Sequence, residues 1–106
     1  MTGLIIPYQG ILPKIAEDAY IAPNATIIGK VKIGACSTIL FNTVIRGDVE
    51  AIYIGERTNL QDGTIVHVTG GKYETHIGNE VSIGHKALIH GSTLEDRFFI
   101  GMSATV

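Results

Sequence analysis

Aliphatic side chains recur at every sixth position over much of this chain of 106 residues. The first uninterrupted run consists of Ile15, Ile21, Ile27, Ile33, Ile39 and Ile45. An α-helix would repeat such residues about every 3.6 positions, and a half-exposed strand about every 2. A period of six fits neither. It indicates a short strand followed by a turn, with one large side chain in each unit directed inward.

A second core position follows each aliphatic residue by four places. Small or branched residues occupy it: Ala19, Ala25, Val31, Ser37 and Thr43. The phase shifts by three residues at 46–51 and is interrupted again at 68–75, where five residues exceed the repeat. Between and after these breaks the pattern continues with Ile54, Leu60, Val66, Ile77, Ile83 and Ile89, then, one residue early, Leu94, Ile100 and Val106. Two inward positions per hexad predict a narrow core along one axis, in a domain spanning 15–106 after a leading segment, 1–14.

Charge and cysteine content exclude several classes of protein. The formal charge is -2, and no basic block could cover a run of phosphates, so we expect no nucleic-acid partner. No apolar run approaches the roughly 20 residues that span a bilayer, so we expect no membrane partner either. Cys36 is the single cysteine, which excludes an internal disulfide and a cysteine-based zinc cluster. These features predict a cytoplasmic protein in which histidine would have to bind any metal.

All four histidines lie between residues 67 and 90. If the five extra residues form a loop, His67 and His90 are one coil apart and stack on the same outward edge. His85 follows Ile83 by two positions and falls near a different corner. Three such imidazoles converge only if neighbouring chains pack side by side around a threefold axis, so the spacing predicts a homotrimer. His76, inside the loop, has no such relation and is expected at the surface.

Hexads of the form Ile-Gly-x-x-small-x resemble those of the hexapeptide-repeat proteins. The resemblance implies an all-β fold, a left-handed parallel β-helix with three flat sides. Three further segments resemble the signature of the γ-class carbonic anhydrase family, particularly its shorter bacterial members: 46–48 (RGD), 58–68 (TNLQDGTIVHV) and 84–91 (GHKALIHG).

This second resemblance implies a metal site between subunits of a trimer. In that family three histidines bind zinc, or sometimes iron or cobalt; here His67 and His90 would come from one chain and His85 from its neighbour. The implied activity is that of a lyase: reversible hydration of carbon dioxide to bicarbonate by a metal-bound hydroxide. Three neutral imidazoles that leave one position open are the ligand set of a catalytic zinc.

The same resemblance assigns polar residues around the site. Gln61 matches a glutamine beside the metal-bound water, and Asn59 is a second candidate for orienting it. For Asn59, a hydrogen bond to the backbone of the adjacent coil is an equal alternative. Arg46 and Asp62 match a pair that bridges subunits, and Asp48 joins that network or caps a turn.

Proton transfer has a single candidate in the extra loop, Glu74. The fully active archaeal members carry a longer acidic loop that this chain lacks, which leaves low or absent hydration activity open. Family members also continue for further hexads and a helix, so we expect a β-helix that is incomplete, and a chain that is truncated, at the C-terminus.

Two other functions are compatible with the sequence. One is a hexapeptide-repeat acyltransferase, in which a histidine acts as general base on a hydroxyl or amine. The other is an assembly module, in which the metal joins subunits and no turnover occurs.

Overall fold

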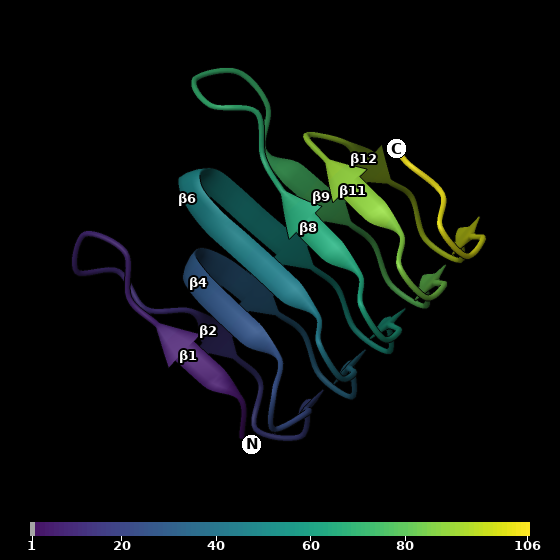
Figure 1. The fold of residues 1–106 in the computed structure, drawn as a ribbon, viewed down its shortest axis with the longest axis horizontal. Helices are drawn as coiled ribbons and strands as arrows, with labels where there is room; N and C mark the ends of the chain where they lie inside the picture. Colours follow the sequence, from purple (N-terminus) through teal and green to yellow (C-terminus); the bar gives the residue numbers. More distant parts are fainter. Residues whose placement is uncertain (1) are drawn as a thin grey trace.

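The computed structural model describes residues 2–106. The chain winds into stacked coils of short parallel strands (Figure 1). The strands are β1 (Leu4–Ile6), β2 (Lys14–Ile15), β3 (Tyr20–Ile21), β4 (Thr26–Ile33), β5 (Thr38–Ile39), β6 (Val44–Ile54), β7 (Asn59–Leu60), β8 (Ile65–His67), β9 (Thr75–Ile77), β10 (Ser82–Ile83), β11 (Leu88–His90), β12 (Thr93–Leu94) and β13 (Phe99–Ile100). Within the described residues, no helix is long and apolar enough to cross a membrane.

The strands form the three flat sides of a prism. The first side stacks β1, β4, β6, β8 and β11, and the third stacks β3, β5, β7, β10 and β13. The second side contains β2, β9 and β12 together with the later halves of β4 and β6, because these two long strands bend around a corner. The leading segment contributes β1 to the first side, where Ile5 pairs with Ile27.

The coils wind in the left-handed sense, as the family resemblance implied. In Figure 1 the strands of the first side lie in front and run toward the upper left, and the chain returns behind them. Successive coils advance from the N-terminus at the lower left to the C-terminus at the upper right, which makes the winding left-handed. This hand is opposite to the rule for ordinary crossover connections. The predicted fold class, a left-handed parallel β-helix with three sides, is confirmed.

The core is the stack of predicted aliphatic residues. All of them are buried except Ile15, which is half-buried, and Val106, which is 41% exposed. Each buried Ile, Leu or Val contributes about 1.5–3 kcal/mol through removal of its side chain from water. The core also contains Ile52 and Thr75, which the sequence analysis did not place there. Ile52 pairs with Val31 and Thr75 pairs with Ile52, so both continue the column of the smaller core position.

Buried hydroxyl groups connect successive coils. The hydroxyl of Ser37 donates to the Gly55 carbonyl oxygen at 2.7 Å, and that of Thr58 donates to the Gly78 carbonyl oxygen at 2.7 Å. Thr43 and Thr64 make the equivalent bonds at other turns. Among residues 2–106 no buried side-chain nitrogen or oxygen lacks a hydrogen-bond partner. The polar residues in the smaller core position are therefore compatible with a dry interior.

The two interruptions of the period lie at one edge of the prism. Gly29 pairs with Gly47 and Val31 with Ile52, so three extra residues bulge from β6 between these pairs. The loop at 68–74 projects next to this bulge, between β8 and β9 (Figure 1). This edge, between the first and second sides, is where His67 and His90 are found.

Candidate functional site

His67 and His90 end two neighbouring strands of the first side. They are paired in the ladder between β8 and β11, as the spacing predicted. Their ring centroids are 5.3 Å apart and the ring planes are tilted by 50°. Two imidazoles from adjacent coils therefore lie on the same outward edge, close enough to share one ligand.

Asp48, in the bulge of β6, holds the His67 ring. Its Oδ1 lies 3.0 Å from Nε2 of His67 and accepts the Val49 N–H at 2.7 Å, while Oδ2 accepts a bond from Arg46 at 2.5 Å. Burial raises the pKa of this carboxyl, but the three hydrogen bonds outweigh burial and place the pKa of Asp48 below its ordinary value. The carboxylate is thus an acceptor at neutral pH. When Nε2 of His67 donates to it, Nδ1 is left with a lone pair.

Thr69 and Thr75 support the same edge, and sequence reasoning missed both. Oγ1 of Thr69 lies 3.4 Å from Nδ1 of His90. The buried Thr75 hydroxyl donates to the His67 carbonyl oxygen at 2.5 Å and accepts the Gly91 N–H at 2.9 Å. The available signal was the alternation of strand residues, which puts positions 67 and 69 on one face.

His85 lies at the opposite border of the first side, in the turn between β10 and β11. Its side chain is 49% exposed, and its Nδ1 is 3.3 Å from Oδ1 of Asp62 in the preceding coil. Asp62 follows Gln61 directly, so Gln61 and His85 share this corner. The prediction that His85 falls on a different corner from the other two imidazoles agrees with this arrangement.

Asn59 hydrogen-bonds to side chains rather than to the backbone of the adjacent coil. Its Oδ1 accepts a bond from Nε2 of Gln61 at 3.3 Å, and its Nδ2 donates to Oγ of Ser82 at 3.0 Å. Ser82 was not singled out in the sequence. It stands opposite Asn59 in the ladder between β7 and β10.

Glu74 and His76 form a separate pair on the second side. Oε1 of Glu74 lies 3.0 Å from Nε2 of His76, and the His76 ring stacks on Tyr53 with centroids 4.8 Å apart. His76 is exposed, as expected, but it lies in β9, where it pairs with Tyr53, and not inside the loop. Within one chain, the partner of Glu74 is this fourth histidine and not one of the three candidate ligands.

The candidate donor set has the chemistry of a metal site, although its three histidines do not converge within one chain. Residues 2–106 of a single chain contain no group of three metal-ligating side chains able to hold an ion. Each candidate histidine nevertheless has one ring nitrogen next to an oxygen: Asp48 for His67, Thr69 for His90 and Asp62 for His85. Such partners fix the ring and leave the second nitrogen for a metal. Three imidazoles of this kind suit zinc, and iron or cobalt as well.

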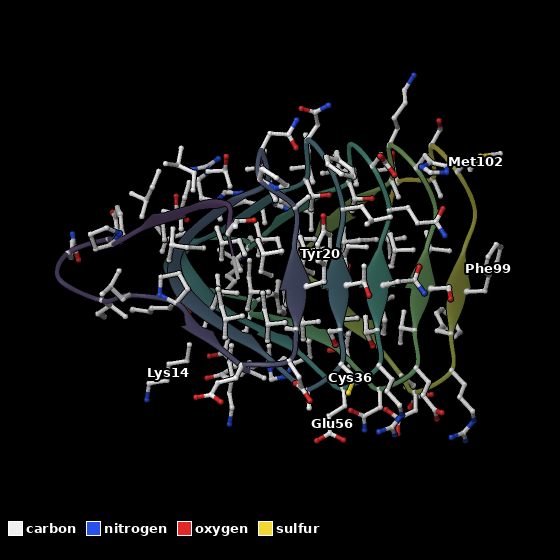
Figure 2. All side chains as sticks on the ribbon, turned by 90° about the horizontal axis from the view of Figure 1, so that it is seen from below. Lys14, Tyr20, Cys36, Glu56, Phe99 and Met102 are labelled. Atoms are coloured by element: carbon white, nitrogen blue, oxygen red, sulfur yellow. The ribbon has the colours of Figure 1, made fainter. Side chains whose placement is uncertain are left out.

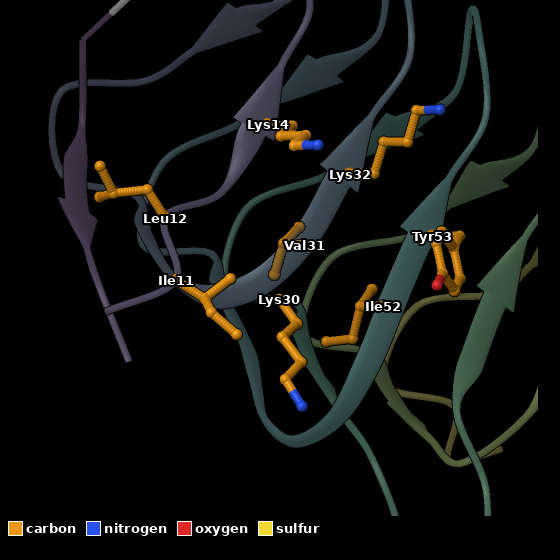
Figure 3. A pocket seen from close by; sticks show the side chains of 8 residues that line it. All are labelled: Ile11, Leu12, Lys14, Lys30, Val31, Lys32, Ile52 and Tyr53. Atoms are coloured by element: carbon orange, nitrogen blue, oxygen red, sulfur yellow. The ribbon is translucent and has the colours of Figure 1, made fainter. Parts of the chain in front are cut away.

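A hollow of about 270 Å³ lies elsewhere, near the start of the prism (Figure 3). No candidate site residue lines it. Its lining consists of Ile11, Leu12, Lys14, Lys30, Val31, Lys32, Ile52 and Tyr53.

Comparison with known proteins agrees with the repeat and with the family resemblance. Residues 13–47 match the family model described as bacterial transferase hexapeptide (six repeats). The chain is 46% identical to gamma carbonic anhydrase 2, mitochondrial, of Arabidopsis thaliana over 89% of its own length and 36% of the relative's. It is 41% identical to the carbonic anhydrase of Geobacillus kaustophilus over 97% of its own length and 56% of the relative's. The chain belongs to the γ-class carbonic anhydrase family of hexapeptide-repeat proteins.

The fold of this family is also found in a solved hexapeptide transferase family protein from Anaplasma phagocytophilum. The TM-score is 0.86 at 36% identity, with 97% of this chain and 70% of that chain covered. The chain spans about a third to three fifths of the length of the curated relatives it matches.

Proposed function

We propose that this chain is the subunit of a homotrimeric, zinc-dependent carbonic anhydrase. One observation carries the proposal. His67 and His90 stack on one border of the first side, His85 lies on the other border, and each ring is held by an oxygen. A ring of three chains brings the first border of each chain against the second border of the next. Each contact then contains three imidazoles from two chains.

The surface between these borders is suited to contact with another copy. Its outward column, in register across the first side, is Leu4, Thr26, Val44, Ile65 and Leu88. In the single chain Leu4 is 56% and Ile65 45% exposed. Contiguous exposed apolar residues mark interaction surfaces. A contact between two different borders is heterologous, and a rotation of one third of a turn closes it into a ring.

Charged residues at the two borders support the same arrangement. Arg46 lies on the His67 border and is half exposed, and Asp62 lies on the His85 corner with its side chain 45% exposed. In the ring, Arg46 of one chain faces Asp62 of the next. Arg46 also contacts Asp48, the partner of His67, and Asp62 is the partner of His85. The pair of Arg46 and Asp62 therefore links the hydrogen-bond partners of two candidate ligands from different chains.

The chain's own residues determine the chemistry at such a contact. A zinc ion held by the three imidazoles would supply a nucleophile for carbon dioxide by lowering the pKa of a bound water toward 7. Asp48 orients the His67 ring, because its carboxylate accepts the Nε2 hydrogen and leaves Nδ1 for a metal. Gln61, at the His85 corner, offers its amide oxygen as a hydrogen-bond acceptor, because its Nε2 is engaged by Asn59. Glu74, with His76, is the exposed pair that would pass the proton to solvent.

The test is metal content together with stopped-flow hydration of carbon dioxide. We expect one zinc ion per chain, carbon dioxide hydration above the uncatalysed rate, loss of activity with a chelator and its recovery with zinc or cobalt. If the metal is fully bound but carbon dioxide is hydrated no faster than in buffer alone, the function is that of the assembly module. A protein that binds no metal would refute the proposed site.

A second candidate is transfer of an acyl group. It is favoured by the matched family model and by the solved neighbour, whose descriptions both name transferases. In this function one histidine removes a proton from a hydroxyl or amine, and no metal is needed. Release of free thiol from acetyl-coenzyme A by metal-free protein would support it over carbon dioxide hydration.

A further inference from the structure

We infer that Ser82 is a positioning residue for Gln61, acting through Asn59. The inference rests on the proposed function for the role of Gln61 at the metal. The hydrogen bonds themselves belong to the folded chain and do not depend on that role. Three side chains from two coils form one continuous array on the third side of the prism.

Asn59 is the central member of this array. Its amide is held at both ends: the oxygen accepts from Gln61 at 3.3 Å and the nitrogen donates to the Ser82 hydroxyl at 3.0 Å. The ladder between β7 and β10 places Ser82 opposite Asn59. All three side chains are half-buried. The bond to Ser82 therefore fixes the part of the array that is furthest from the His85 corner.

This fixation matters because, in the described residues, the bond to Asn59 is the hydrogen bond that the Gln61 side chain makes. Ordering a glutamine side chain costs up to about 2 kcal/mol of entropy. With Nε2 bound to Asn59, the amide oxygen of Gln61 is the group left to face the corner that carries His85. Without the Ser82 hydroxyl, Asn59 loses one of its two restraints, and the position of Gln61 is less defined. A polar group that is already correctly placed before the reaction increases the rate of the catalysed step.

The third side provides a matched control. Its outward column contains, in register, Tyr20, Thr38, Asn59, Ser82 and Phe99, and Figure 2 labels the aromatic residues at its two ends. Thr38 and Ser82 are thus the two ladder neighbours of Asn59. Among the described residues only Ser82 is hydrogen-bonded to the Asn59 amide nitrogen. Removing the Thr38 hydroxyl therefore tests the effect of altered packing next to Asn59. Removing the Ser82 hydroxyl tests the effect of losing the hydrogen bond to Asn59.

The experiment compares Ser82→Ala, Ser82→Thr and Thr38→Ala by two readouts. The first is the side-chain amide NMR signal of Gln61 in metal-free protein. Gln9 is the other glutamine in the chain and serves as internal reference. We expect the Gln61 signal to shift or broaden in Ser82→Ala. Its chemical shift and line width should match those of the wild type in Ser82→Thr and Thr38→Ala. The Gln9 signal should be unchanged in all three variants.

The second readout is the kinetics of the zinc-loaded protein. We expect kcat of Ser82→Ala to fall about tenfold or more, the size expected when a residue that orients a metal-site group is lost. KM and zinc content should not change, Ser82→Thr should restore kcat, and Thr38→Ala should match the wild type. If Ser82→Ala does not fold, Ser82→Cys, which keeps the shape with a weaker hydrogen-bonding group, replaces it.

The two readouts separate failure of the inference from failure of the proposed function. An unchanged Gln61 signal in Ser82→Ala, or an equal change in Thr38→Ala, overturns the positioning role. If the wild type does not hydrate carbon dioxide, the NMR comparison still decides whether Ser82 orders Gln61. A shifted signal with an unchanged kcat in an active enzyme would also overturn the positioning role.

Discussion

Replacing His85 by alanine is expected to remove the metal from every contact between chains. The variant keeps His67 and His90, but two imidazoles from one chain do not complete a three-nitrogen site. Loss of even an outer partner of a metal ligand costs about 10- to 100-fold in affinity or activity, so we expect carbon dioxide hydration to fall by more than about 100-fold. Elemental analysis of the purified protein and stopped-flow kinetics measure the two effects.

The matched control for this variant is His76→Ala. His76 is also an exposed histidine, but it pairs with Glu74 and stacks on Tyr53 on another side. We expect it to keep full zinc content. Normal zinc content in His85→Ala would contradict the proposed metal site. An equal loss of zinc in His85→Ala and His76→Ala would contradict it as well.

Replacing Ile45 by alanine is expected to lower the free energy of unfolding by about 2–5 kcal/mol. Ile45 is fully buried and pairs with Ile27 on one side and Val66 on the other. The shortened side chain leaves a cavity in the middle of a stack that has no other means of filling it. Denaturant unfolding measures the loss. It should be done at one protein concentration, because dissociation of an oligomer contributes to its apparent stability.

Leu12→Ala is the control for the core variant. Leu12 is also aliphatic but 57% exposed, so we expect a loss of less than about 1 kcal/mol. Similar losses in the two variants would mean that the stacked aliphatic residues do not form the principal core.

The period of six was sufficient to predict the fold because each coil repeats the same inward positions. Where extra residues break the period, the same reasoning did not predict which individual residues enter the core. Ile52 and Thr75 are core residues, yet each lies just beyond an insertion, where counting forward from the last regular hexad gives the wrong phase. Their assignment requires the register of the coil that follows. The later aliphatic residues supply that register two positions further on.

At the candidate site, the sequence predicted which histidines stack, because stacking depends on the number of residues per coil. It did not predict their partners. Thr69 and Ser82 depend on which side chains of adjacent coils are within hydrogen-bonding distance, and residue spacing does not determine rotamers. The contact between Arg46 and Asp48 lies inside one chain and corresponds to one of the two roles that the sequence left open for Asp48.

The central claim, a metal site shared between two chains, is tested most directly by mixing two inactive variants. One is His85→Ala and the other carries His67→Ala with His90→Ala. After unfolding and refolding together, every mixed ring of three contains a single contact with an intact His67 and His90 on one chain and an intact His85 on the next. We predict zinc binding and carbon dioxide hydration at that one contact, and neither in the separate variants. Mixed assemblies that bind no zinc, or zinc retained by either variant alone, would contradict the shared site.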